Sequence, residues 1–230
     1  MSAFLIILAI IILLVIIFLP QYWVAHVIKK NQQPSDQIPG NGGQFARHLL
    51  DRFNLQDVAV EQTQSGDHYD PQDRVIRLSE DNFNNHSLSA IVIAAHEVGH
   101  AIQHGTHYRL FKLRGFLAVA GIIAEKTGII IFMIMPILTL VSRAPIVGLL
   151  GSLSALALLG VGVLVHLVTL PVEWDASFNR ALPILEAGDY IDDKDMHAAR
   201  QILKAAALTY LAGALASLLN FSRWISILRR

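Results

Sequence analysis

One long apolar segment limits what this chain can fold into. From Ile146 to Leu170 the sequence contains no Asp, Glu, Lys or Arg, and a helix of that length can cross the hydrocarbon layer of a membrane. A second apolar run extends from Phe4 to Leu19, followed by Tyr22 and Trp23, aromatic residues that favour the membrane interface. With 53% hydrophobic and only 16% charged residues, the chain is predicted to be an integral membrane protein.

The N-terminal run is predicted to be a retained membrane anchor and not a cleaved signal peptide. No Lys or Arg precedes the run, and no small-x-small cleavage pattern follows it closely. The anchor and its juxtamembrane segment are predicted to occupy residues 1–30, which end at Lys29 and Lys30.

The region 115–170 is predicted to form a membrane hairpin that turns at Arg143-Ala144-Pro145. Its first half is interrupted by Glu125-Lys126, and one continuous helix would place this charged pair inside the bilayer at considerable cost. We therefore expect a surface or core-packed segment up to Ile123, and a separate span from about Gly128 to Ser142.

Residues 31–114 are predicted to form a small soluble α+β domain between the anchor and the hairpin. Gln44 to Phe53 has the apolar spacing of an amphipathic helix. Val58-Ala59-Val60 and Val75–Leu78 resemble two short strands joined by a polar turn. The strand Arg74–Leu78 is the candidate sheet edge for pairing with an extended peptide.

An H-E-x-x-H motif at residues 96–100 predicts a metal site on a helix. His96 and His100 are four residues apart, so both imidazoles leave the same helical face and can converge on one metal ion. Glu97 stands beside the first histidine, where a carboxylate can take a proton from water at the metal. Ser87 can cap the start of this helix.

A catalytic zinc site normally has a third protein ligand and one position open for water. A membrane hairpin returns the chain to the side that it left, so Glu173, just after the second span, emerges on the side of His96 and His100. This topology nominates Glu173 as the third ligand, and Asp175 is the second candidate.

Four stretches together resemble the YugP-type membrane zinc metallopeptidases, the neutral zinc metallopeptidase family of bacteria. They are Asp67–Pro71, Val75–Asp81, His96–His104 and Leu170–Ser177. The likeness runs from about Gly40 to the C-terminus. It implies a mainly α integral membrane protein with a small zincin-like α+β catalytic domain, of gluzincin type and distantly similar to the HtpX and Ste24 proteases.

The resemblance implies His96, His100 and Glu173 as ligands of Zn²⁺ and Glu97 as the general base. The distant relatives carry Glu-x-x-Ala-Asp at the third ligand, and their Asp orients a zinc-binding histidine. Ser177 stands at that Asp position here. Ser177, Asp175 or another group is therefore expected to take this role.

A donor for the oxyanion is also expected, but the sequence does not single one out. The candidates are His68, Tyr69, Tyr108, His166 and Arg180, and for each of them a role in packing or at the interface is the simpler explanation. His104 and His107 are expected at the surface or next to the ligands, and Trp174 in the core or at the membrane interface.

The segment 171–230 is predicted to carry the third ligand and a C-terminal helix that begins at Met196. Its apolar part, 202–221, is a candidate further span, so three to four transmembrane helices are expected. Lys and Arg on the domain side (Lys29, Lys30, Arg109, Lys112, Arg114, Arg180, Lys204) outnumber those on the other side (Arg143, Arg223, Arg229, Arg230). The positive-inside rule then predicts a multi-pass protein of the bacterial inner membrane with a cytoplasmic catalytic domain.

The predicted function is zinc-dependent endopeptidase activity on protein or peptide substrates, with membrane proteins and their quality control suggested by family analogy. Zero net charge gives no reason to expect nucleic acid, and the absence of cysteine excludes disulfides and thiolate ligands. A site-2-type intramembrane protease is one alternative, but its Asp-Gly ligand motif is missing. The other is a scaffold with a structural zinc, which would not need Glu97. The sequence does not predict an oligomeric state.

Overall fold

A computed structural model describes residues 3–34, 38 and 40–208 of the chain. Its helices are α1 (Ala3–Lys30), α2 (Gly42–Arg52), α3 (Glu80–Asn84), α4 (Leu88–Gly105), α5 (Arg109–Ser142), α6 (Pro145–Trp174), the π-helical segment η1 (Asp175–Ala181) and α7 (Leu182–Ala187). Its strands are β1 (Ala59–Thr63), β2 (His68–Asp70) and β3 (Val75–Ser79). The mainly helical composition with one small sheet agrees with the predicted mainly α chain that carries a small α+β part.

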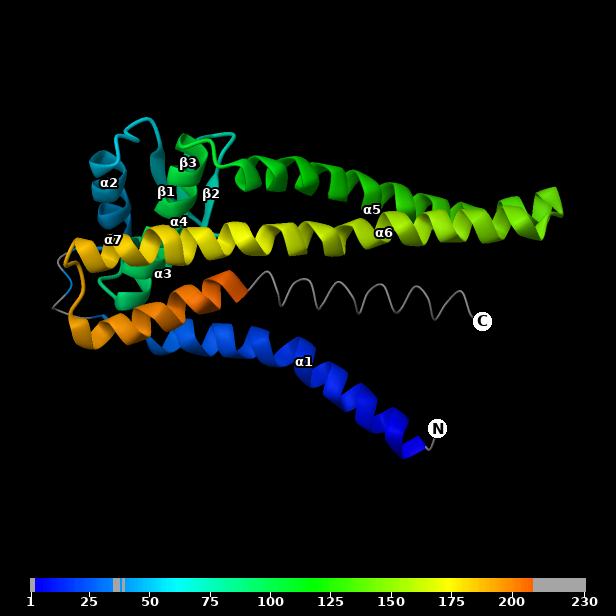
Figure 1. Ribbon diagram of the computed structural model, residues 1–230, viewed down its shortest axis with the longest axis horizontal. Coiled ribbons are helices and arrows are strands. Elements are labelled where there is room, and N and C mark those ends of the chain that lie inside the picture. Colours follow the sequence, from blue (N-terminus) through cyan, green and yellow to red (C-terminus); the bar gives the residue numbers. More distant parts are fainter. Residues whose placement is uncertain (1–2, 35–37, 39, 209–230) are drawn as a thin grey trace.

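The long helices α1, α5 and α6 leave the α+β domain on the same side (Figure 1). Two helices in the described part of the chain are long and apolar enough to cross a membrane: Arg109–Ser142 and Pro145–Ala187, the latter formed by α6 with its continuation through α7. Residues 193–208 form a further helix, whereas most of the predicted span 202–221 lies outside the described residues.

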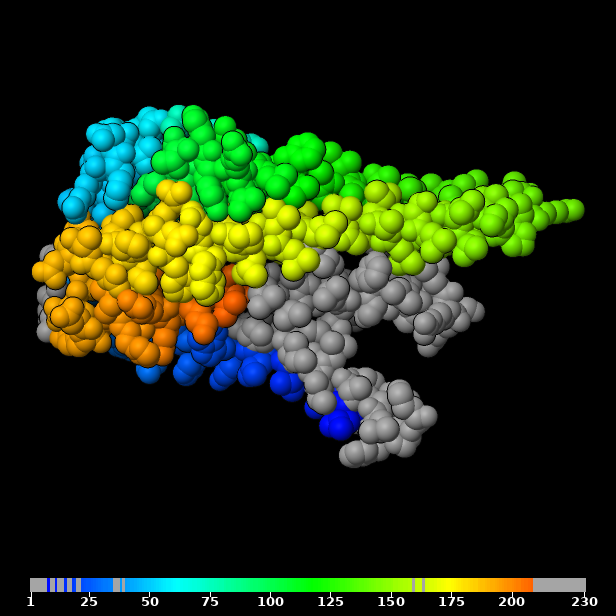
Figure 2. All heavy atoms as spheres, in the orientation of Figure 1, coloured from blue at the N-terminus to red at the C-terminus, as the bar shows by residue number. Residues whose placement is uncertain are grey.

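The predicted break in the first half of the hairpin was wrong, whereas the membrane span from about Gly128 to Ser142 stays a prediction. The structure has one continuous helix, α5, through Glu125 and Lys126, and both side chains are exposed. At about 1.5 Å per residue its 34 residues extend roughly 50 Å, which exceeds the hydrocarbon thickness of about 30 Å. A continuous helix can therefore cross the membrane and still hold the charged pair near its surface. Figure 2 shows α5 and α6 packed against each other along their length.

The sheet differs from the expected pair of strands. A third strand, β2, follows β1, and the order in space is β1-β3-β2, with β1 parallel and β2 antiparallel to β3. The strand proposed as the free edge, β3, is therefore central. A three-residue strand such as His68–Asp70 has too little alternation to be seen in a sequence, and β2 forms the edge in its place.

Caps fix the two helices that build the domain core. Asn41 caps α2 in a reciprocal capping box with Gln44, and the Ser87 hydroxyl accepts a hydrogen bond from Ala90 N at the start of α4. The predicted helices at 44–53 and around the motif are thus confirmed. Leu49 and Leu50 of α2 are completely buried, and the residues of α4 from Ser89 to Ala95 are also buried. This packing makes α4 a rigid base for the site.

Candidate metal centre

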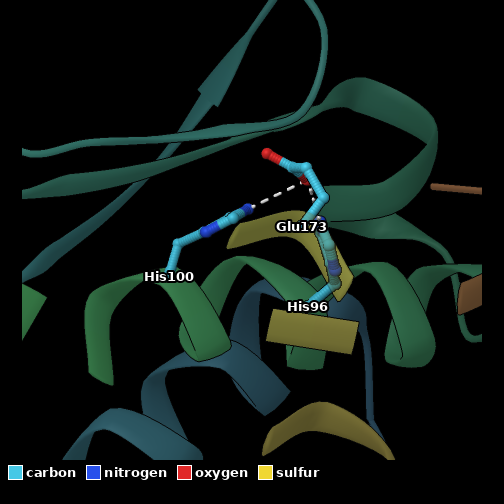
Figure 3. A group of neighbouring side chains, drawn as sticks. All are labelled: His96, His100 and Glu173. Atoms are coloured by element: carbon cyan, nitrogen blue, oxygen red, sulfur yellow. Dashed lines mark hydrogen bonds and ion pairs between the residues drawn. The ribbon is translucent and has the colours of Figure 1, made fainter. Parts of the chain in front are cut away.

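Three buried side chains from two helices converge on one point (Figure 3). His96 and His100 project from one face of α4, and Glu173 projects from the last turn of α6. The Glu173 Oε2 atom lies 3.2 Å from His96 Nε2 and 3.3 Å from His100 Nε2. The structure therefore brings together the three residues predicted as ligands.

The spacing of these atoms fits a metal better than direct hydrogen bonds. With zinc–ligand bonds of about 2.0–2.1 Å, two ligand atoms of a tetrahedral site lie about 3.3 Å apart. A charge-assisted N–H···O bond is shorter, at about 2.7–2.9 Å. The separations of 3.2 and 3.3 Å match two edges of such a tetrahedron, and all three ligand atoms lie within 4.8 Å of one another. Two nitrogens with one carboxylate oxygen are ligands that Zn²⁺ accepts.

Hydrogen bonds on the far side of each imidazole leave its Nε2 atom free to ligate. The Ser177 hydroxyl donates to Leu203 O at 3.2 Å, so it accepts the Nδ1–H of His96 at 3.0 Å. The Gln103 amide donates to Val172 O, and its oxygen accepts the Nδ1–H of His100 at 2.9 Å. An Nδ1–H tautomer carries a lone pair on Nε2, which is what a metal requires.

Asp175, the second candidate ligand, supports the site from behind. Its Oδ2 atom accepts hydrogen bonds from Gln103 and Arg180, both at 2.8 Å. Burial raises the pKa of Asp175, but the hydrogen bonds from Gln103, Asn179 and Arg180 outweigh it and leave the pKa below its ordinary value. Two residues thus divide the role left open by the sequence: Ser177 orients His96, and Asp175 orients His100 through Gln103.

The Glu97 carboxyl lies in the same cavity as the three ligand candidates. Only 6% of the residue is exposed. Burial raises its pKa to about 7. A carboxyl group whose pKa lies near neutral pH can both accept and return a proton under physiological conditions.

Sequence reasoning missed Arg114, which was assigned only to the membrane surface. The Nη1 atom of Arg114, on α5, lies 2.9 Å from Glu173 Oε1. This contact is an ion pair and not an aligned hydrogen bond. No local motif marks Arg114, because its partner is far away in the sequence.

A glycine allows the two ligand-bearing segments to approach closely. A Cβ atom on Gly99 would lie 2.8 Å from the backbone oxygen of Ala176, too close for any other residue without a shift of the backbone. Ala176 belongs to η1, and π-helical turns of this kind are frequent at functional sites. The wider turn continues α6 without a break and places Ser177 against α4.

The cavity in front of the site has a volume of about 220 Å³. Of the five predicted oxyanion donors, His68 and Tyr69 line it, whereas Tyr108, His166 and Arg180 do not. The Tyr69 hydroxyl is hydrogen-bonded to His104 Nδ1 at 2.8 Å, and His68 Nδ1 donates to Gly66 O at 2.9 Å. His107 is exposed, and Trp174 is 46% exposed beside Phe178.

Two histidines one helical turn apart, a distant glutamate and an adjacent buried carboxyl group define a site of the zinc metallopeptidase class. The chain belongs to the neutral zinc metallopeptidase family: the family described as "Putative neutral zinc metallopeptidase" matches residues 6–229. "Putative membrane protease YugP" of Bacillus subtilis (strain 168) is 35% identical over 221 residues, which cover 90% of each chain. No solved structure matches the chain.

Proposed function

We propose that the protein is an integral membrane zinc endopeptidase in which Glu97 is the general base. The observation that carries this proposal is the position of Glu97, buried in the cavity that the three ligand candidates line. A zinc ion held only for structure has no use for a fourth, unligated carboxyl group at this place. A structural site is also usually closed by four protein ligands, and the described residues bring together three.

In this proposal His96, His100 and Glu173 hold the metal, and Ser177, Gln103 and Arg114 hold the ligands. Zinc, when bound, polarises the scissile carbonyl and lowers the pKa of the attacking water. Glu97 takes a proton from that water and delivers it to the leaving amine.

An extended substrate is proposed to pair with the edge strand β2. The central position of β3 excludes the edge first expected from the sequence, whereas β2 is bonded on one side only and contributes His68 and Tyr69 to the cavity wall. Backbone pairing of this kind holds a peptide without reading its side chains.

The membrane part of the proposal rests on the printed name of the Bacillus relative and on the long apolar helices. We propose that α1, α5 and α6 each cross the bacterial inner membrane and that the domain faces the cytoplasm. Action on membrane proteins during quality control is the proposed cellular role. The site-2-type alternative is disfavoured, because the third ligand candidate is a glutamate beyond the membrane hairpin.

The proposal is tested on purified, detergent-solubilised full-length protein by measuring bound zinc per chain and cleavage of an unstructured reporter. We expect Glu97→Gln to keep its zinc and to lose activity by about 10²-fold or more, and Glu173→Ala to lose zinc. Glu80→Gln, an exposed glutamate on α3, is the matched control and should behave as wild type. Equal activity of wild type and Glu97→Gln would leave a structural metal site as the explanation.

A further inference from the structure

The cavity at the metal site is lined in part by residues of three helices, of which α1 and α5 cross the membrane in the proposed function. Ile28 comes from the last turn of α1, Arg114 from the start of α5, and Ala206 from the helix 193–208. Glu173 ends α6. The height of the site above the membrane can therefore be measured along the same helices that cross it.

The hairpin gives the first measurement. The part of α6 from Pro145 to Glu173 is about 42 Å long at about 1.5 Å per residue. The hydrocarbon layer takes up about 30 Å of this length. If the turn at residues 143–145 reaches the far boundary, Glu173 lies about 12 Å outside the near boundary.

Two further helices agree with this height. On α1 the apolar run ends at Leu19, and Ile28 is nine residues, or about 13 Å, further on. On α5 the charged pair Glu125-Lys126 follows Arg114 by eleven to twelve residues, or about 17 Å. Lengths measured along three different helices, α6, α1 and α5, thus place the membrane boundary about 12–17 Å from the cavity.

A strong tilt of the hairpin would lower the site toward the membrane, and it would also place in lipid the exposed apolar side chains of α5, which begin at Leu113 (42% exposed) and Phe116 (70% exposed). Such a tilt would carry Glu125 and Lys126, both exposed on α5, well into the hydrocarbon. Charged residues at the centre of the bilayer cost about 2.5–3.5 kcal/mol each, even on the lowest scale. In the upright arrangement the pair lies within about one helical turn of the boundary, far from the centre of the bilayer, so this cost is small.

We propose that the site cleaves polypeptides anchored in the same membrane, at bonds a fixed short distance outside the bilayer. This inference rests on the proposed peptidase function, and it adds to the proposed action on membrane proteins the position of the cut. An extended chain covers about 3.3–3.6 Å per residue, so a bond closer than about four residues to the end of the substrate's membrane helix does not reach the site.

Anchoring also sets an outer limit. A short tether gives the target bond an effective concentration in the millimolar range, which then falls with roughly the −3/2 power of tether length. Cleavage is therefore expected to peak a few residues beyond the inner limit, at about four to ten residues from the membrane, and to decline further out. The same tail without an anchor lacks this advantage.

The test uses full-length protein in lipid vesicles with a reporter that has one transmembrane helix and a long unstructured tail of repeated sequence. Because every repeat offers the same bonds, the positions of the cuts, mapped by mass spectrometry, report reach and not sequence preference. We expect cuts to begin about four residues from the membrane, and the detached tail at micromolar concentration to be cut at least tenfold more slowly. Glu97→Gln is the blank.

The outcomes separate this inference from the function on which it rests. Equal cleavage of the anchored and detached tails, or cuts spread evenly along the tail, would leave the peptidase intact and overturn the inference. If the wild type cuts neither tail, the proposed peptidase function is wrong, and so is the inference that rests on it.

The height itself has an independent readout, because the chain has no cysteine. Single cysteines at Lys112, Lys126 and Met133, all exposed on α5, can carry a fluorophore whose quenching by spin-labelled lipids reports depth. We expect the label at 112 to be outside the bilayer, that at 126 at the boundary and that at 133 in the hydrocarbon. A label at 126 as deeply quenched as that at 133 would contradict the upright arrangement.

Discussion

The metal helix α4 and the hairpin helix α5 are both rich in apolar residues, but the protein buries most of α4 and little of α5. Nearly every residue of α4 from Ser89 to Ala101 is buried. In α5 only Phe111, Gly121 and Gly128 are buried among the described residues. The comparison teaches that α4 is positioned by side-chain contacts, whereas α5 relies on its partner α6 and, in our proposal, on lipid. The site is assembled where these two kinds of environment meet.

The largest effect on stability is expected from the buried carboxyl group on α4. Because burial raises the pKa of Glu97 from 4.5 to about 7, the unfolded metal-free chain loses this proton at lower pH than the folded protein does. The free energy of unfolding therefore falls between about pH 4.5 and 7, by about 3 kcal/mol in all. Metal-free Glu97→Gln should melt at higher temperature than metal-free wild type at pH 8, but not at pH 4.5.

Tryptophan fluorescence during heating in detergent can measure this difference. Glu80→Gln removes an exposed glutamate and should melt like the wild type at both pH values. A gain for Glu97→Gln of the same size at pH 4.5 and pH 8 would show that ionisation of this group is not the cause.

Glycines on the two helices should respond in opposite directions to the same substitution. Gly99→Ala on α4 places a methyl group 2.8 Å from Ala176 O and should lower the free energy of unfolding by about 1–3 kcal/mol. Gly115→Ala on α5 meets no described atom within 4 Å and should be neutral or stabilising by up to about 1 kcal/mol. Thermal unfolding of both variants tests the contrast, and equal shifts would abolish it.

Arg114, on the hairpin helix α5, forms an ion pair with the ligand candidate Glu173. Arg114→Gln leaves the buried Glu173 carboxylate without its ion-pair partner, so zinc affinity should fall about 10–100-fold. Competition with a chromophoric chelator measures this without any assay of activity. Lys112→Gln, an exposed cation two residues earlier on α5, is the control, and equal affinities for the two variants would remove Arg114 from the site.

The smallest effect is expected at Ser177, which holds His96 through one neutral hydrogen bond of 3.0 Å. Ser177→Ala should weaken zinc binding by about tenfold in the same chelator competition. Ser154→Ala removes an exposed hydroxyl that bonds only to its own helix, at Leu150 O, and should change nothing. Unchanged affinity in Ser177→Ala would mean that the packing of α4 alone holds His96.

Sequence predicted best what depends on local spacing. The i, i+4 histidines, the Ser87 cap and the apolar stretches required no knowledge of distant contacts. Glu173 was reached through topology, because a hairpin must return to its starting side. Arg114 and Gln103 escaped notice because their roles arise only when α4, α5 and α6 are placed together. The continuous α5 was also missed, because the cost of a charged pair in lipid depends on depth, which the sequence alone does not give.

The separation of the ligand candidates has a consequence for how the protein is made. His100 and Glu173 are 73 residues apart, and the whole hairpin lies between them. A nascent chain whose hairpin has not yet inserted holds two histidines but cannot bring the glutamate to them. On our proposal a newly synthesised copy stays inert on the ribosome and in the cytosol, and becomes a protease only on arrival at its membrane.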